Sequence, residues 1–297
     1  MILESLSRKI VAAVVVGLSV AWVVWTIGGL NFSDADAYRL AADRFLRGQD
    51  IYVAAPNQDE AFRYAPWFAV AWVPLAALPE LAGDMVWANI LAVASAFAVL
   101  PLARQPFLSA RLLAILGAAM LAWTTARGNV HPLVMVALVR GLDRRSGPLW
   151  LALAASLKAV PILFVLLYVA RREWSRAAVA IALTALLVAP MPFMGWELGT
   201  VDSGESLSLY YLVSPTAWAL VAVASVIVAV AGTVAARRYA GVAAAAAAIL
   251  TLPRLLLYDL TYVLVGAHRS AGPIRQAARG ESSAAGHSRA ARPNTGP

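Results

Sequence analysis

Long apolar segments recur along this chain, separated by short polar turns. Each is roughly 20 residues long, the length that an α-helix needs to cross the hydrocarbon core of a bilayer. A mean hydropathy of +0.73 and a charged fraction of only 13% lie outside the usual range of soluble globular domains. The sequence therefore predicts an all-α fold, a polytopic transmembrane helical bundle. Its long segments are residues 10–30, 85–102, 107–125, 177–194 and 215–236.

The charges of the chain predict its orientation in the membrane. The formal net charge of +8 comes almost entirely from arginine, and the basic residues gather in the turns after Val139, Ala170 and Ala236. Loops rich in arginine and lysine stay on the cytoplasmic side, so we place these turns on the cytoplasmic face of the plasma membrane. This distribution makes nucleic acid a poor candidate partner. The chain has no cysteine, which excludes disulfides and cysteine-ligated metal sites.

Shorter apolar stretches interrupt this regular pattern. Residues 66–79 carry proline at both ends and form either a short span or a re-entrant element. In the stretch 148–170, Pro161 follows Lys158 by three residues and is predicted to break the helix into two halves. Non-helical backbone at membrane depth is tolerated where it lines a cavity. We expect one membrane domain over residues 1–267 and a disordered, basic cytoplasmic tail over residues 268–297.

A polar stretch, the external loop of residues 31–65, holds six of the sixteen carboxylates. A helix is expected from Ser33, with Ser33 or Asp34 as the N-cap and Gly48 as its end. Tyr38 begins an apolar face that continues at helical spacing through Ala41, Ala42 and Phe45. This spacing predicts an amphipathic helix that lies at the membrane interface. Because the loop is acidic, we place it on the outer side of the membrane.

Ionisable groups in or against a membrane bundle are functional candidates, because burying them is costly. A carboxylate can take a proton while cations hold an anionic group. Structural explanations exist for several candidates: Asp34 can cap a helix, Lys158 can extend to the interface, and His131 precedes a proline. No metal-binding pattern is present, and no cofactor is predicted. The candidates are Asp34, Asp36, Arg127, His131, Lys158, Arg254 and Asp259.

Five short motifs follow one another along the chain. They are Asp34 with Tyr38, Phe62-Arg63-Tyr64-Ala65-Pro66, Gly128-Asn129-Val130, the segment around Lys158 and the basic turn after it, and Pro253-Arg254 through Tyr258-Asp259. In this order, these motifs resemble glycosyltransferase family 87, whose members are mannosyltransferases of the GT-C fold that use polyprenyl-phosphate-mannose. The chain departs from the family in lacking the glutamine that the family's central turn has before the position of Asn129.

The resemblance implies a membrane enzyme that transfers a hexose, expected to be mannose, from a polyprenyl-phosphate-sugar donor to a glycolipid or glycan acceptor. Transfer would occur on the outer face of the membrane with inversion, and membrane lipids would be further partners. Asp34 would be the general base, with Asp36 as its substitute if the register shifts by two. The implied substrate-binding residues are Lys158, Arg254, Arg127, Asn129, His131, Tyr64, Tyr258 and Asp259.

A second hypothesis is a lipid-carrier translocase or transporter without transferase activity. It explains the broken helices and Lys158 equally well. It does not explain the large acidic outer loop with Asp34, Tyr38 and the Phe62–Pro66 motif. A structural membrane subunit would require neither Lys158 nor Arg254 at membrane depth.

Overall fold

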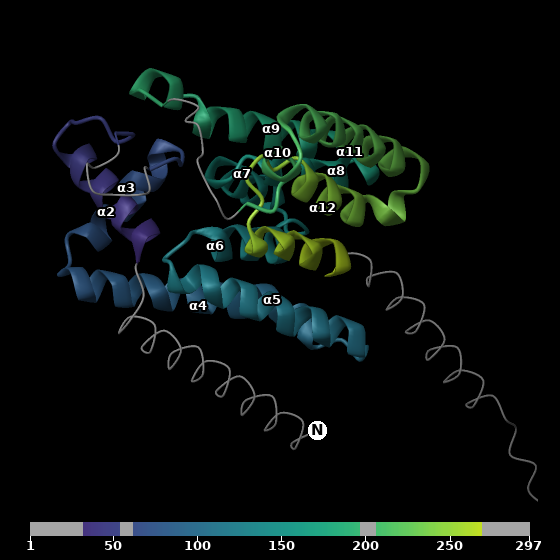
Figure 1. The fold of residues 1–297 in the computed structure, drawn as a ribbon, viewed down its shortest axis with the longest axis horizontal. Helices are drawn as coiled ribbons and strands as arrows, with labels where there is room; N and C mark the ends of the chain where they lie inside the picture. Colours follow the sequence, from purple (N-terminus) through teal and green to yellow (C-terminus); the bar gives the residue numbers. More distant parts are fainter. Residues whose placement is uncertain (1–31, 54–61, 197–205, 269–297) are drawn as a thin grey trace, which may run out of the picture.

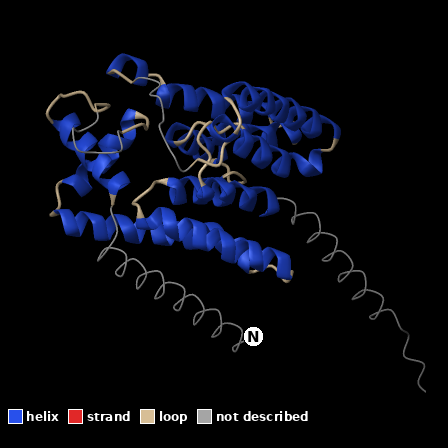
Figure 2. Cartoon of the chain, in the orientation of Figure 1, coloured by secondary structure: helices blue, strands red, loops and turns tan. Residues whose placement is uncertain are grey.

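The computed structural model describes residues 32–53, 62–196 and 206–268. Within these ranges the chain is helical and has no strand (Figure 2). Four helices are long and apolar enough to cross a membrane, which confirms the predicted polytopic helical protein. The first apolar segment, residues 10–30, and the predicted tail, residues 268–297, lie outside the described residues, except His268, which ends a helix. The four spans are α4 (Glu80–Ala103), α5 (Leu108–Ala126), Trp174–Met194, which contains α9 (Trp174–Val188), and α11 (Pro215–Ala235).

The helices form two groups with a layer between them (Figure 1). The α4–α5 pair runs along one side, and α7, α8, α9, α11 and α12 gather on the other. Between them lie α6 and a helical stretch over residues 257–268, while α2 and α3 close one end. The remaining bounds are α2 (Ser33–Leu46), α3 (Pro66–Ala76), α6 (His131–Val136), α7 (Gly147–Leu157), α8 (Leu166–Ala170), α10 (Leu209–Leu212) and α12 (Ala240–Leu250).

The helix predicted in the external loop is α2, and it ends as expected before Gly48, whose φ of 65° suits glycine. The expected cap was wrong. Phe32 occupies the N-cap without a side-chain cap bond, so Asp34 lies in the first turn. Tyr38 on the apolar face is buried together with Ala41 and Ala42, whereas Phe45 is 39% exposed.

The short apolar stretch after the external loop forms α3, a helix of 11 residues. This is about half the length of a bilayer-spanning helix. Phe68 and Trp72 on α3 pack edge-on against Tyr38, with ring centroids 5.0 and 5.7 Å apart. Aromatic packing therefore fixes α2 against α3, beside the transmembrane bundle.

The predicted helix break near Lys158 is present. Helix α7 ends at Leu157, Lys158 is extended (φ −143°, ψ 124°), and a 3₁₀ turn over Val160–Val165 leads into α8. Pro161 has no amide hydrogen to donate and is placed in the first turn of this 3₁₀ segment. A second interruption lies between α12 and the 3₁₀ turn Leu257–Thr261, and it contains Arg254.

Candidate active site

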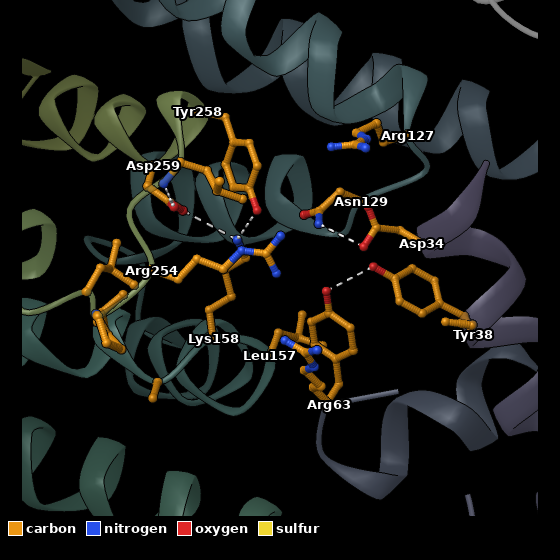
Figure 3. Close-up of a pocket in the computed structure, with 17 residues that line it drawn as sticks. Asp34, Tyr38, Arg63, Arg127, Asn129, Leu157, Lys158, Arg254, Tyr258 and Asp259 are labelled. Carbon is orange, nitrogen blue, oxygen red and sulfur yellow. Dashed lines mark hydrogen bonds and ion pairs between the residues drawn. The ribbon is translucent and has the colours of Figure 1, made fainter. Parts of the chain in front are cut away.

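The two interruptions and the start of α2 meet at one cavity of about 340 Å³ (Figure 3). All of the predicted site residues line it except Asp36 and His131. The lining residues come from α2, the segment before α3, the α5–α6 turn, the α7 break and residues 252–259. Its polar members are Asp34, Tyr38, Arg63, Tyr64, Arg127, Asn129, Lys158, Arg254, Tyr258 and Asp259.

Asp34 is held at the cavity by the turn between α5 and α6. Its Oδ1 accepts a hydrogen bond of 3.2 Å from Asn129 Nδ2, and its backbone amide donates to the carbonyl of Arg127 at 3.3 Å. Gly128 makes this approach possible, because its φ is 72° and an added Cβ would lie 2.8 Å from the Cβ of Ala35. The Gly128-Asn129 pair therefore both admits the first turn of α2 and orients its carboxylate.

Asp36 lies two residues further along α2 and does not line the cavity. It lies near Asp84 and Glu80 of α4, together with Arg39. Burial and these two carboxylates raise the pKa of Asp36, and Arg39 partly opposes the effect. Arg39 forms its ion pair with Asp84 at 2.7 Å. The structure therefore separates the two candidate bases, with Asp34 in the cavity and Asp36 outside it.

Two tyrosine hydroxyls line the cavity close to Asp34 and the α5–α6 turn. Tyr38 donates to the hydroxyl of Tyr64 at 3.1 Å and accepts from the backbone amide of Val130 at 3.2 Å. Burial raises the pKa of both tyrosines, so both hydroxyls are protonated near neutral pH. Tyr38 was not among the predicted binding residues, although its spacing from Asp34 was part of the family resemblance.

Lys158 lies at the helix break and contacts two neighbouring residues of the 3₁₀ turn Leu257–Thr261. Its Nζ is 3.4 Å from Asp259 Oδ1, 3.4 Å from the Tyr258 hydroxyl and 4.4 Å from the centre of the Tyr258 ring. The other Asp259 oxygen accepts from the amide of Leu256 at 3.0 Å. Asp259 therefore balances the charge of Lys158 and fixes the position of its ammonium group.

Three arginines add positive charge to the cavity. Arg63, Arg127 and Arg254 line it, and none of them forms an ion pair within the part of the chain that the structure describes. Within that part, the buried Nε of Arg254 also has no hydrogen-bond partner. Buried donors normally have an acceptor. With Lys158 balanced by Asp259, three guanidinium groups face the single remaining carboxylate, Asp34, and the cavity suits an anionic ligand.

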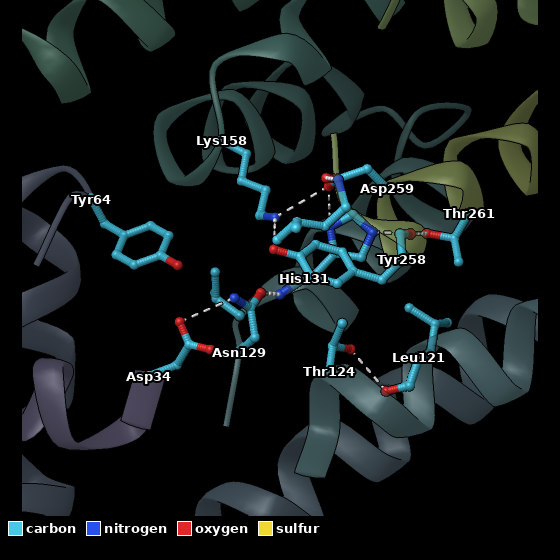
Figure 4. A network of polar contacts seen from close by, with 12 residues as sticks. Asp34, Tyr64, Leu121, Thr124, Asn129, His131, Lys158, Tyr258, Asp259 and Thr261 are labelled. Carbon is cyan, nitrogen blue, oxygen red and sulfur yellow. Dashed lines mark hydrogen bonds and ion pairs between the residues drawn. The ribbon is translucent and has the colours of Figure 1, made fainter. Parts of the chain in front are cut away.

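His131 is fully buried and does not line the cavity; it belongs to a network of polar contacts with residues that do (Figure 4). Its Nε2 lies 2.8 Å from Thr261 Oγ1, and its Nδ1 lies 3.9 Å from Asp259 Oδ1. Its backbone amide donates to Asn129 Oδ1 at 2.9 Å. His131 therefore connects Asn129 to the 3₁₀ turn that carries Asp259, through its contact with Thr261, and has no exposed surface for a ligand.

Comparison with known families connects this geometry to an activity. Residues 62–203 match the sequence model of glycosyltransferase family 87. The match indicates a glycosyltransferase, with a sugar donor and an acceptor as its substrates. It includes Arg63, Arg127, Asn129 and Lys158, and it begins after Asp34. No curated protein matches the chain, and no solved structure matches it.

The candidate site differs from the sequence prediction in two ways. Sequence reasoning placed His131 with the binding residues, whereas the structure places it behind them, with Thr261 as a partner that was not predicted. It also left out Arg63, which lies within the Phe62–Pro66 motif and was therefore detectable. No group of three or more His, Cys, Asp or Glu residues in the described ranges is arranged to hold a metal ion.

Proposed function

We propose that this protein transfers a hexose, mannose in particular, from a polyprenyl-phosphate-sugar donor to a glycolipid or glycan acceptor, with inversion at the anomeric carbon. The observation that carries this proposal is the cavity itself. It brings Asp34 of the external loop together with Lys158 and Arg254 from two helix interruptions (Figure 3). A carboxylate and a cluster of cations within one cavity are the groups that transfer from a phosphosugar requires.

The cations are assigned to the donor phosphate. Arg254 and Arg127 line the cavity without an ion pair in the described chain, and Lys158 adds a positioned ammonium group. Guanidinium groups bind phosphate oxygens through two parallel hydrogen bonds, which Arg254 can supply with its terminal nitrogens. These interactions strengthen as the leaving phosphate gains charge, so they favour the transition state over the bound donor.

Asp34 is assigned as the general base. The acceptor hydroxyl oxygen attacks the anomeric carbon, the bond from that carbon to the phosphate oxygen breaks, and the hydroxyl proton moves to the Asp34 carboxylate. The bonding electrons leave with the phosphate that the cations hold. Attack from the side opposite the leaving group inverts the configuration and needs no covalent intermediate. Asn129 donates to Asp34 and thereby keeps one carboxylate oxygen in place.

Two tyrosine hydroxyls are assigned to the sugar, which would lie between Asp34 and the cations that hold the phosphate. Tyr64 and Tyr258 line the cavity, and each presents a hydroxyl close to its polar network. The volume of about 340 Å³ lies at the small end of the roughly 300–1,000 Å³ typical of ligand sites. This space suits a sugar phosphate whose lipid chain lies outside, in the membrane.

We place the site on the outer face of the plasma membrane. The acidic external loop, which carries Asp34, opposes the arginine-rich turns after Val139 and Ala170. A lipid-linked donor suits this location, because its chain remains in the bilayer while its phosphosugar reaches the interface. Nucleotide sugars are cytosolic molecules and would not reach such a site.

The proposal is tested with purified protein in proteoliposomes. Vesicles containing polyprenyl-phosphate-[³H]mannose and a glycolipid fraction from the source membrane are expected to yield radiolabelled acceptor, whereas a nucleotide-mannose donor is expected to yield none. A matched assay follows movement of the same polyprenyl lipid between the two leaflets. Lipid movement without sugar transfer would refute the transferase and support a translocase.

A further inference from the structure

A second cavity, of about 270 Å³, lies between α4, α7 and the π-helical turn Ala137–Gly141 that follows α6. It shares no lining residue with the candidate active site. Its lining combines positive charge with apolar surface. The six residues are Phe97, Val136, Arg140, Gly141, Arg144 and Trp150.

The positive charge at this cavity has no counter-charge in its lining. Arg140 and Arg144 are its charged members, and Arg104 lies near enough to act electrostatically on Arg140. Burial, followed by the charges of Arg104 and Arg144, lowers the pKa of Arg140. None of the three forms an ion pair with a described residue. An anion bound among them would relieve this repulsion.

The guanidinium group of Arg140 is held in place by α4. Its Nε donates to the carbonyl of Phe97 at 3.0 Å, and its central carbon lies 5.8 Å from the centre of the Phe97 ring. The opposite wall is equally defined. Trp150 packs onto Gly141, where an added Cβ would lie 2.5 Å from the Trp150 Cβ, and its indole donates to Ser146 Oγ at 3.1 Å. Arg140 and Trp150 are therefore held on two sides of the cavity, and Arg144 lies at an exposed position beside them.

Apolar side chains lead from this cavity along the outside of the bundle. Phe97 is 51% exposed, and Val93, one helical turn earlier on α4, is 49% exposed. Both belong to a candidate membrane span, which ends at Ala103 immediately before Arg104. The cations therefore lie near the end of the span, at the depth where lipid headgroups meet acyl chains. A soluble anion would gain nothing from Phe97 and Trp150.

We propose that this cavity binds the phosphate headgroup of an anionic membrane lipid. Arg140 and Arg144 contact the phosphate, and the acyl chains lie against Phe97 and Val93 of α4. The planar guanidinium group matches a phosphate in geometry and charge. Because this lipid lies at a different cavity from the candidate active site, its binding can be measured without an activity assay.

The test is native mass spectrometry of the purified full chain in detergent, titrated with phosphatidylglycerol. The Arg140→Gln/Arg144→Gln variant is expected to bind the lipid about tenfold more weakly than the wild type, because charge-assisted hydrogen bonds to the phosphate are lost. The matched control is Arg237→Gln/Arg238→Gln, which removes two charges from another basic turn, and it is expected to bind as the wild type does. Arg144→Gln alone guards against a loss of binding caused by misfolding. Arg144 is exposed, so this variant should keep the fold and the hydrogen bond from Arg140 to Phe97.

Three outcomes would overturn the proposal. The first is equal weakening in the control pair, which would mean that binding follows total charge. The second is equal affinity for the zwitterionic phosphatidylcholine. The third is displacement of the lipid by millimolar inorganic phosphate, which would identify a site for soluble anions. A tenfold loss confined to the Arg140 and Arg144 variants, with selectivity for phosphatidylglycerol, supports it.

Discussion

Replacing Asp34 with asparagine tests the assigned base most directly. The side chain keeps its shape, and its oxygen can still accept the 3.2 Å hydrogen bond from Asn129. Because that bond loses the charge on its acceptor, we expect a stability loss of only about 1 kcal/mol. The amide cannot accept a proton from the acceptor hydroxyl, and a positioned general base contributes roughly a hundredfold to ten-thousandfold in rate. This corresponds to about 3 to 5 kcal/mol of transition-state stabilisation.

The measurement is the initial rate of sugar transfer in proteoliposomes, with donor binding measured separately. Asp34→Asn should bind the polyprenyl donor nearly as the wild type does and transfer it at least a hundredfold more slowly. Asp36→Asn is the matched control, since Asp36 lies on the same helix outside the cavity, and its rate should stay within about threefold of the wild type. An Asp34→Asn enzyme with near-normal turnover would refute the assignment, and a dead Asp36→Asn enzyme would move the base by two residues.

Further predictions concern the cations, the backbone and the topology. Lys158→Ala should raise the KM for the donor and destabilise the protein by about 3 to 5 kcal/mol, because it leaves Asp259 buried without its partner. Lys158→Arg should retain more donor affinity. Equal KM values for the two variants would show that Lys158 does not bind the donor. Gly128→Ala should lower the thermal stability, because the φ of Gly128 is 72° and an added Cβ would meet Ala35. The control is Gly232→Ala in α11, which should not lower it, since no atom lies within 4 Å of an added Cβ. Equal melting temperatures of the two variants would contradict this account. A cysteine at the exposed Val53 should react with an impermeant reagent in intact cells, and one at Arg145 only after lysis; the reverse pattern would invert the topology.

The sequence predicted the helices wherever a local signal was strong. Spans α4, α5 and α11 follow from length and hydropathy, and the break at Lys158 follows from Pro161. It gave the wrong N-cap for α2, because capping propensity favours Ser33 or Asp34, whereas the tertiary contact with Arg127 places Asp34 inside the first turn. Local propensity gives no information on such a contact between residues far apart in the chain.

The residues of the site were predictable as a set, but their separate roles were not. Burial cost identified Lys158, Arg254 and Asp259 as candidates, and all three line the cavity. The sequence could not show that Asp259 balances Lys158, because their contact joins a helix break to a distant 3₁₀ turn. Nor could it place His131 behind the cavity, since a histidine before proline has no signature that separates a ligand-binding residue from a supporting one.

The position of the cavity follows from where the helices are interrupted. Backbone groups released at a helix break need polar partners, and inside a membrane bundle these must come from the protein or from a water-filled cavity. The break at Lys158, the segment around Arg254 and the turn at Gly128 meet at one place, so their polar requirements are met together. His131 then links the two sides through Asn129 and Thr261, with no surface exposed to the cavity. Under the proposed function, the groups assigned to proton transfer and to phosphate binding are positioned relative to each other before any substrate enters, and such preorganisation would lower the barrier to transfer.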